Sequence, residues 1–103
     1  MKTTRLHEAP KVPFNLDGHI VAHCQNIEVI HLHLKPGEIL EKHTNPFDVI
    51  LYVLEGKAMI EAGNEKALVQ KDESVCIEAG TARAIENISV SDFKLLVIKI
   101  PNN

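Results

Sequence analysis

The chain has 103 residues with a formal net charge of −3 at pH 7, and 45% of them are hydrophobic and 24% charged, which is the composition of an ordinary globular domain. The slight acidity argues against nucleic acid and anionic membranes as partners, because both select for basic patches. No apolar run approaches the roughly 20 residues that a membrane-spanning helix needs, and the first residues, MKTTRLHEAPKVPF, lack the apolar core of a secretory signal. We therefore expect a single domain, residues 1–103, in the cytoplasm.

The predicted elements are almost all strands. Residues 1–14 are expected to form an N-terminal arm that either frays or pairs with a partner chain. Apolar stretches then predict strands over residues 19–24, 27–35, 49–55, 57–62, 66–70, 74–79, 82–88 and 93–100, with turn-forming residues such as Pro36-Gly37 and Gly63-Asn64 between them. Helix patterns are weak throughout. Short strands at this spacing are typical of an antiparallel all-β sandwich or barrel.

Two of the predicted strands, 49–55 (VILYVLE) and 93–100 (FKLLVIKI), are apolar on both faces or nearly so. Such strands lie inside a sheet and are covered on both sides. A domain of this size also has a poor ratio of volume to surface, which self-association improves. We therefore expect a homodimer.

The cysteines, Cys24 and Cys76, are far apart and form no C-x-x-C motif. We expect reduced thiols, with Cys76 buried as a small apolar residue.

Several glycines and polar residues have the spacing of motifs in a known protein family. The segment from Gly37 through His43 to Gly56, together with the later Gly80 and Asn87, resembles the two motifs of the cupin superfamily. The resemblance covers roughly residues 28–100. It implies a small single-domain cupin, a jelly-roll barrel of antiparallel strands that commonly dimerises. It also implies a divalent metal bound by two histidines and a glutamate from the first motif and a histidine from the second.

The ligand positions of this resemblance are mostly replaced. His43 stands at the first histidine, but Asn45 stands at the second, Val49 at the glutamate and Arg83 at the last histidine. Asparagine offers only a neutral carbonyl oxygen, valine offers nothing, and arginine brings a fixed cation. We expect the usual four-ligand metal site to be missing, with His43 left as a metal candidate.

A rearranged metal site is the alternative, with His31 and His33 as partners of His43. The two histidines share one face of their predicted strand, and Ile30, Leu32 and Leu34 share the other. If the leucine face is the barrel interior, both histidines point outward. If the histidine face is interior, they lie near His43 and could help to bind a divalent metal.

The expected ligand pocket consists of His43, Asn45, Val49, Leu51 and Arg83. Its arginine could bind a carboxylate, phosphate or sugar hydroxyl, or it could pair with a nearby acid, Asp48 or Glu78, and only plug the site.

The sequence assigns no catalytic residue, because no nucleophile–base pair or phosphate loop is found. The preferred function is small-molecule binding, of an anionic or sugar-like ligand, without a metal cofactor. One alternative is a metal-dependent oxygenase or isomerase with a rearranged ligand set around His43. Another is a non-catalytic interaction barrel.

Overall fold

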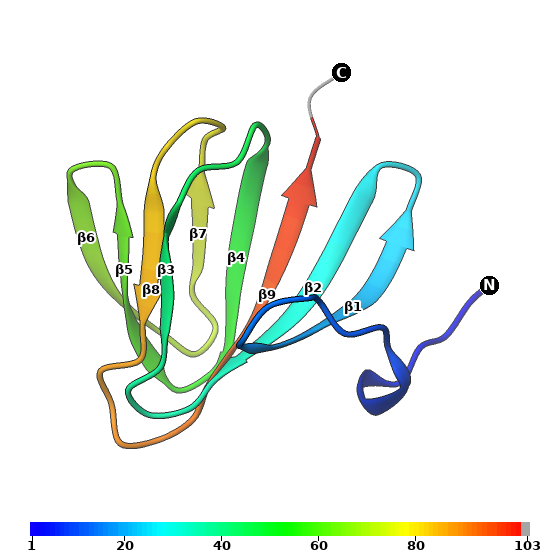
Figure 1. Cartoon of the computed structure of the whole chain (residues 1–103), viewed down its shortest axis with the longest axis horizontal. Coiled ribbons are helices and arrows are strands. Elements are labelled where there is room, and N and C mark those ends of the chain that lie inside the picture. The colour runs from blue at the N-terminus through cyan, green and yellow to red at the C-terminus, as the bar shows by residue number, and fades with distance from the viewer. Residues whose placement is uncertain (102–103) are drawn as a thin grey trace.

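The computed structural model describes residues 1–101, which form an almost purely β structure (Figure 1). A short 3₁₀ helix, η1 (Leu6–Glu8), precedes the strands. The strands are β1 (Asp17–Cys24), β2 (Ile27–Leu34), β3 (Ile39–His43), β4 (Asp48–Glu55), β5 (Lys57–Ala62), β6 (Glu65–Gln70), β7 (Ser74–Ile77), β8 (Arg83–Glu86) and β9 (Phe93–Ile100). The prediction of an all-β fold with antiparallel strands is confirmed.

The strands form two antiparallel sheets. The larger has the order β1-β2-β9-β4-β7, and the smaller has the order β3-β8-β5-β6. Figure 1 shows β1 and the N-terminal residues at the end of the molecule farthest from β6. The larger sheet therefore extends past the smaller one on the β1 side.

The core lies between the sheets and follows from the alternation of side chains along the strands. The inward residues of β2, β4 and β9 are at most 5% exposed: Ile30, Leu32, Leu34, Val49, Leu51, Val53, Phe93 and Leu95. Burying each such side chain stabilises the folded state by about 1.5–3 kcal/mol relative to leaving it exposed. The leucine face of β2 is thus the interior, and His31 and His33 lie on the outer face of the larger sheet.

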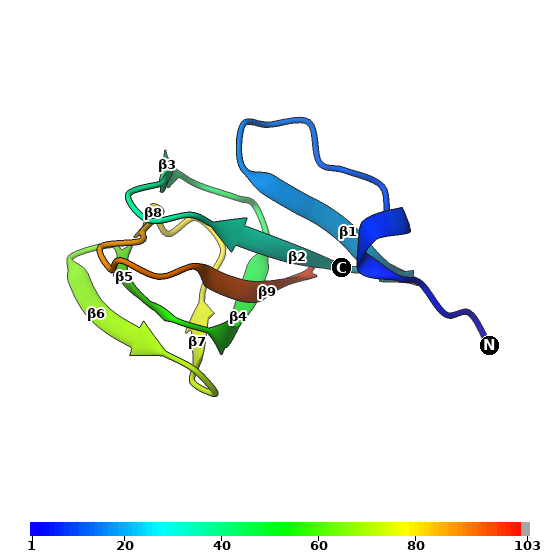
Figure 2. The same cartoon turned by 90° about the horizontal axis from the view of Figure 1, so that it is seen from below.

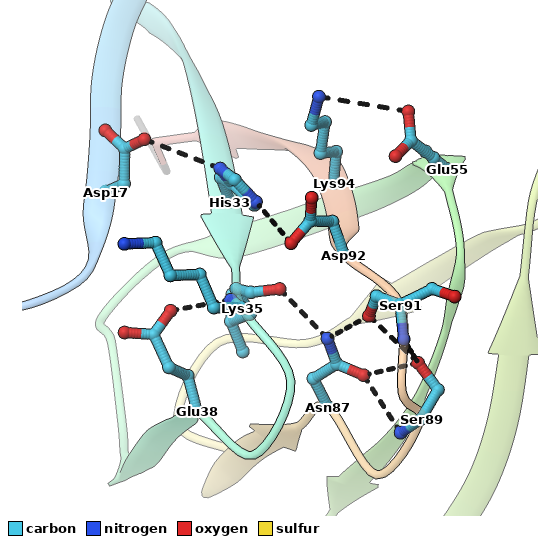
Figure 3. A network of polar contacts seen from close by, with 11 residues as sticks. Asp17, His33, Lys35, Glu38, Glu55, Asn87, Ser89, Ser91, Asp92 and Lys94 are labelled. Atoms are coloured by element: carbon cyan, nitrogen blue, oxygen red, sulfur yellow. Dashed lines mark hydrogen bonds and ion pairs between the residues drawn. The ribbon is translucent and has the colours of Figure 1, made fainter.

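The motif glycines and asparagine have structural roles here. Gly56 has φ of +84°, and a Cβ there would collide with the Asp92 carbonyl oxygen. Asn87 is fully buried, and its amide nitrogen donates hydrogen bonds to the carbonyl oxygens of Leu34 (2.9 Å) and Ser91 (2.8 Å) (Figure 3). Its side-chain oxygen accepts from the backbone nitrogen and hydroxyl of Ser89. Asn87 therefore holds the loop between β8 and β9 against the end of β2.

The N-terminal arm lies against its own chain. The backbone nitrogen of Val12 donates to the Gly18 carbonyl oxygen over 2.9 Å, and that of Ile20 donates to the Pro10 carbonyl oxygen over 2.8 Å. Val12 and Leu16 are buried. Within the expected arm, residues 1–14, Pro10 and Val12 thus pair with β1 of their own chain. This segment covers the inner face of β1, which extends past the smaller sheet, and pairing of the arm with a partner chain stays a prediction.

Two expectations are corrected. The sequence analysis did not predict β3, whose residues Ile39–His43 form the edge of the smaller sheet. Cys76 is exposed rather than buried, because it lies on the edge strand β7 and faces away from the core while its neighbour Ile77 faces in. Cys24 is also free and exposed. Within residues 1–101, no helix is long and apolar enough to cross a membrane.

Candidate functional site

A cleft of about 490 Å³ opens where the two sheets diverge. Its floor is the inner face of the larger sheet, formed by Ile30 and Leu32 of β2 and Val97 of β9. This volume is within the range of about 300–1,000 Å³ that is typical of small-molecule sites.

The two walls of the cleft come from distant parts of the sequence. One wall is the loop before β1, with Phe14 and Leu16, and the other is β3, with Ile39 and Leu40. Figure 2 shows that this loop and β3 lie on the same side of β2. Phe14 is 41% exposed and Ile39 is 43% exposed. The walls thus present large apolar side chains to whatever enters.

Polar groups gather at the end of β3. His43 and Asn45 line the cleft there, and the Nδ1 of His43 donates to the Glu41 carbonyl oxygen over 2.9 Å. The loop that follows is fixed by two hydrogen bonds from the turn before β8. The Gly80 nitrogen donates to the Asn45 carbonyl oxygen, and the Ala79 nitrogen donates to Oδ1 of Asp48, each over 2.8 Å. The position of Asn45 is therefore well defined.

Arg83 lies behind Asn45 and is only 4% exposed. It begins β8, where it pairs with His43 of β3 on one side and Ala62 of β5 on the other. With the Asn45 amide oriented so that its oxygen accepts, Nη2 of Arg83 donates to that oxygen over 2.9 Å, and the amide nitrogen donates to the Thr44 carbonyl oxygen over 3.2 Å. Nε and Nη1 of Arg83 have no hydrogen-bond partner among the described residues.

No carboxylate compensates this buried cation in the part of the chain that the structure describes. Loss of hydration lowers the pKa of the Arg83 guanidinium from its ordinary value. The alternative that Arg83 pairs with Asp48 or Glu78 is wrong. Asp48 instead accepts the hydrogen bond from Ala79, and Glu78 is exposed.

The other residues of the expected pocket have different places. Val49 and Leu51 are each 2% exposed and belong to the hydrophobic core between the sheets, not to the cleft lining. Of the five residues of the expected pocket, His43 and Asn45 line this cleft, whereas Val49, Leu51 and Arg83 are not among its lining residues. Val49 and Leu51 face the interior, as the strand alternation predicted, but neighbouring core side chains fill the space in front of them.

His19, His31 and His33 form a separate cluster on the outer face of the larger sheet. Nε2 of His19 lies 2.9 Å from Oδ1 of Asp17, and Nδ1 of His33 lies 3.5 Å from Oδ2 of the same carboxylate. Nε2 of His33 lies 3.2 Å from Oδ1 of Asp92, at ion-pair distance but without hydrogen-bond geometry (Figure 3). His33 therefore bridges two acids on the side of the sheet that is remote from His43.

Two pKa values in this cluster are shifted. Burial alone would raise the pKa of Asp17, but the hydrogen bonds and charges of His19 and His33 outweigh it and hold that pKa below its ordinary 3.8. The pKa of His31 lies below its ordinary 6.5, mainly because burial disfavours its charged form and also because of the Lys94 cation.

Comparison with known proteins identifies the family. The family model described as "Cupin domain" matches residues 30–99, most of the chain. The chain belongs to the cupin family. A curated relative, the tetracenomycin polyketide synthase protein TcmJ of Streptomyces glaucescens, is 34% identical over 58 residues, which are 55% of this cupin and 39% of TcmJ. This cupin thus aligns with well under half of that relative.

Solved structures share the fold over nearly the whole chain. The TT1209 protein of Thermus thermophilus is 26% identical with a TM-score of 0.83, and each chain is covered completely. KdgF from Halomonas sp. is 16% identical with a TM-score of 0.83, over 100% of this cupin and 96% of KdgF. A predicted oxalate decarboxylase of Thermotoga maritima is 15% identical with a TM-score of 0.85, over 98% of this cupin and 100% of that chain. The latter two likenesses concern the fold alone.

The residues at the ligand positions of this cupin do not fit a metal cage. His43 faces the Arg83 position across the β3–β8 pairing, so the retained donor has a fixed cation as its neighbour. Transition metals need several strong donors at once, and no cluster of three or more His, Cys, Asp or Glu that could hold a metal is found within residues 1–101. The rearranged set of His31, His33 and His43 is not assembled either, because the first two lie on the opposite face of the larger sheet.

Sequence reasoning missed most of the cleft lining. Phe14, Leu16, Ile39 and Leu40 were not assigned to the site, because they come from an arm and an edge strand that only the tertiary fold brings together. A usable signal was present, since large apolar residues, among them Phe14 and Ile39, occur in segments that the sequence analysis did not assign to a strand.

Proposed function

We propose that this cupin binds a small anionic molecule in the cleft without a metal ion, and that Arg83 is the group that receives the negative charge. His43 and Asn45 are the polar groups that the ligand meets first. The proposal assigns binding, with no catalytic step.

The observation that carries this proposal is the buried, uncompensated guanidinium of Arg83. Removing a cation from water costs several kcal/mol unless an anion and good hydrogen bonds offset it. Arginine presents two parallel N–H groups that match a carboxylate. Here two of its nitrogens, Nε and Nη1, have no partner among the described residues. An anion at this position would supply both the missing charge and the missing acceptors.

Asn45 connects the cleft to that charge. It lines the cleft, and its amide oxygen is a neutral acceptor for Nη2 of Arg83. A ligand carboxylate that displaces this amide exchanges a neutral acceptor for a charged one, and hydrogen bonds to ionised acceptors are about twice as strong.

We also propose that this cupin acts as a homodimer in the cytoplasm. The unpaired cysteines, Cys24 and Cys76, are both exposed, and exposed thiols persist in a reducing compartment.

The test is a thermal-shift measurement with small monocarboxylates such as propionate and benzoate, in buffer with EDTA. At a free ligand concentration of one hundred times Kd, binding should raise the free energy of unfolding by about 2.7 kcal/mol. This increase raises Tm by roughly 10 °C or more in a domain of this size. Arg83→Met should abolish the response, and Arg83→Lys should keep a reduced one because the cation remains. The control is Arg5→Met, because Arg5 is the other arginine and its side chain is 78% exposed.

Three results would contradict the proposal. Wild-type protein could fail to respond to any acid, Arg83→Met could respond as the wild type does, or EDTA could abolish the response. The stability of ligand-free Arg83→Met gives an independent check. Replacing a buried charge without a partner by an apolar side chain of similar size should leave the free energy of unfolding unchanged or raise it.

A further inference from the structure

We infer that the anion carries an apolar body, so that the ligand is a monocarboxylic acid with an aliphatic or aromatic chain lying in the cleft. This inference rests on the proposed function, and it names the class of ligand for the same site.

The lining of the cleft is the first argument. The floor and the larger part of both walls are aliphatic and aromatic side chains. The polar lining residues are Asn15, Glu41, Lys42, His43, Asn45 and Lys99. Phe14 and Ile39 remain about two-fifths exposed on opposite walls. A hydrocarbon body between these walls would remove their apolar surface from water, which is favourable in proportion to the area buried.

The charges around the cleft exclude polyanions. Two lysines line it, but Nζ of Lys99 is 3.5 Å from Oε1 of Glu28, and Nζ of Lys42 is 3.0 Å from Oε2 of Glu61. Both cations already have a carboxylate partner, and Glu41 adds a negative charge to the lining. Arg83 is not itself a lining residue, but it contacts the lining residue Asn45, and as a cation without an ion pair among the described residues it offsets one negative charge. A ligand with several phosphates would bring negative charge that these groups do not balance.

The same lining disfavours sugars. This narrows the ligand class that the sequence predicts, which includes both anionic and sugar-like molecules. Each hydroxyl that enters an apolar cleft without a hydrogen-bond partner costs roughly 1–3 kcal/mol. The floor residues Ile30, Leu32 and Val97 and the wall residues Phe14 and Ile39 offer no side-chain donor or acceptor. A ligand with one polar end and an apolar remainder fits this distribution, and a polyol does not.

The experiment is calorimetry with straight-chain acids from acetate to octanoate and with the matching primary alcohols, all in EDTA. Each added methylene should tighten binding of the acids about fourfold until the cleft is full. Phe14→Ala and Ile39→Ser should flatten this dependence on chain length, with a larger loss of affinity for octanoate than for acetate. The control is Val90→Ala, because Val90 is 94% exposed and lies outside the cleft lining.

The arms of the experiment separate the two proposals. Acids that bind in an Arg83-dependent manner with an affinity independent of chain length would overturn this inference and leave the anion site intact. Alcohols that bind as tightly as acids, in wild type and Arg83→Met alike, would overturn both. Length-dependent binding of acids that is much tighter than that of alcohols supports both.

Discussion

His43 and Arg83 are directly opposed in the pairing of β3 with β8. Opposed residues on one face of an antiparallel pair have Cβ atoms about 4.5–5.5 Å apart. The histidine that remains from the family's metal-binding motif thus has a permanent cation beside it, and that cation would repel a metal ion bound at the histidine. The residue that stands at the position of the last metal ligand, Arg83, is also the group to which we assign anion binding.

Metal binding should depend on the three replaced ligand positions. The triple variant Asn45→His, Val49→Glu and Arg83→His should bind divalent zinc or nickel near stoichiometrically, because it restores the donor set that the family resemblance implies. Wild-type protein should bind neither metal stoichiometrically. Elemental mass spectrometry after dialysis measures both samples. A stoichiometric metal in the wild type that is lost in His43→Ala would contradict the account.

The free energy of unfolding should depend on pH in two windows because of the outer histidine cluster. The folded-state pKa of Asp17 is below 3.8, so the folded protein binds this proton less readily than the unfolded chain does. Its contribution is present above about pH 4 and is lost as the pH falls through the folded-state pKa. The carboxyl is partly exposed, so the effect should be about 1 kcal/mol or less.

The second window belongs to His31, whose folded-state pKa is below 6.5. The unfolded chain again binds more protons, so stability rises with pH up to about 6.5 and levels off above it. Urea midpoints between about pH 3 and pH 8 measure both windows. Asp17→Asn should remove the loss of stability below about pH 4. His31→Gln should remove the rise in stability with pH up to about 6.5. Midpoints of wild type and variants that run parallel over the whole range would refute this assignment.

Gly56 and Gly37 are two turn glycines at which the effects of an alanine substitution on stability can be compared. Both have positive φ, +84° and +83°, but a Cβ at Gly56 meets the Asp92 backbone while a Cβ at Gly37 meets nothing within 4 Å. Gly37→Ala should lower the free energy of unfolding by about 1–2 kcal/mol from backbone strain alone. Gly56→Ala should cost about 3 kcal/mol or more, because the backbone must also shift. Equal losses in denaturant unfolding would show that the Asp92 contact does not matter.

Sequence reasoning recovered most of the fold for a physical reason. Strands such as β2, β4 and β9 bury one face, and this alternation is visible in the residues themselves. Strand β3 was missed because ILEKH is short and three of its five residues are exposed at the sheet edge, so no alternation marks it. The orientation of His31 and His33 stayed open because both faces of β2 carry apolar residues.

The site was less predictable than the fold. The positions of His43, Asn45 and Arg83 followed from the spacing of the motifs, but the apolar walls did not. Phe14 and Ile39 are 25 positions apart in the sequence, and only the arm folding back under β1 brings them to one cleft. Such contacts depend on tertiary packing, which local patterns do not encode.

The outer face of the larger sheet should form the dimer interface. One row of cross-strand neighbours, Ala22, Val29, Ile98, Ile50 and Cys76, crosses all five strands with no charged side chain. Four strands of eight residues and one of four present roughly 600 Å² of flat sheet. The relief of the side chains brings this area close to the 800 Å² or so that each partner buries in a stable complex. A second copy, whose identical row is self-complementary about a two-fold axis, is the occupant that this row fits.

Light scattering after size-exclusion chromatography measures this prediction. Wild-type protein should have the mass of a dimer, and Ile50→Glu should have that of a monomer because two carboxylates would face each other across the axis. The control is Leu68→Glu, since Leu68 is 55% exposed on the other sheet. A wild-type monomer, or a dimer that Ile50→Glu leaves intact, would rule out this interface.

The most direct test of the central claim is the ¹H–¹⁵N resonance of the Arg83 side chain during a titration with octanoate in EDTA. The chain has only two arginines, Arg5 and Arg83, so their Nε–H signals are easily assigned with Arg5→Met. We predict that the Arg83 signal moves downfield as Nε gains a charged acceptor, with the Arg5 signal unchanged. Octanoate that binds without moving the Arg83 signal, or that binds only after a divalent metal is added, would contradict the account.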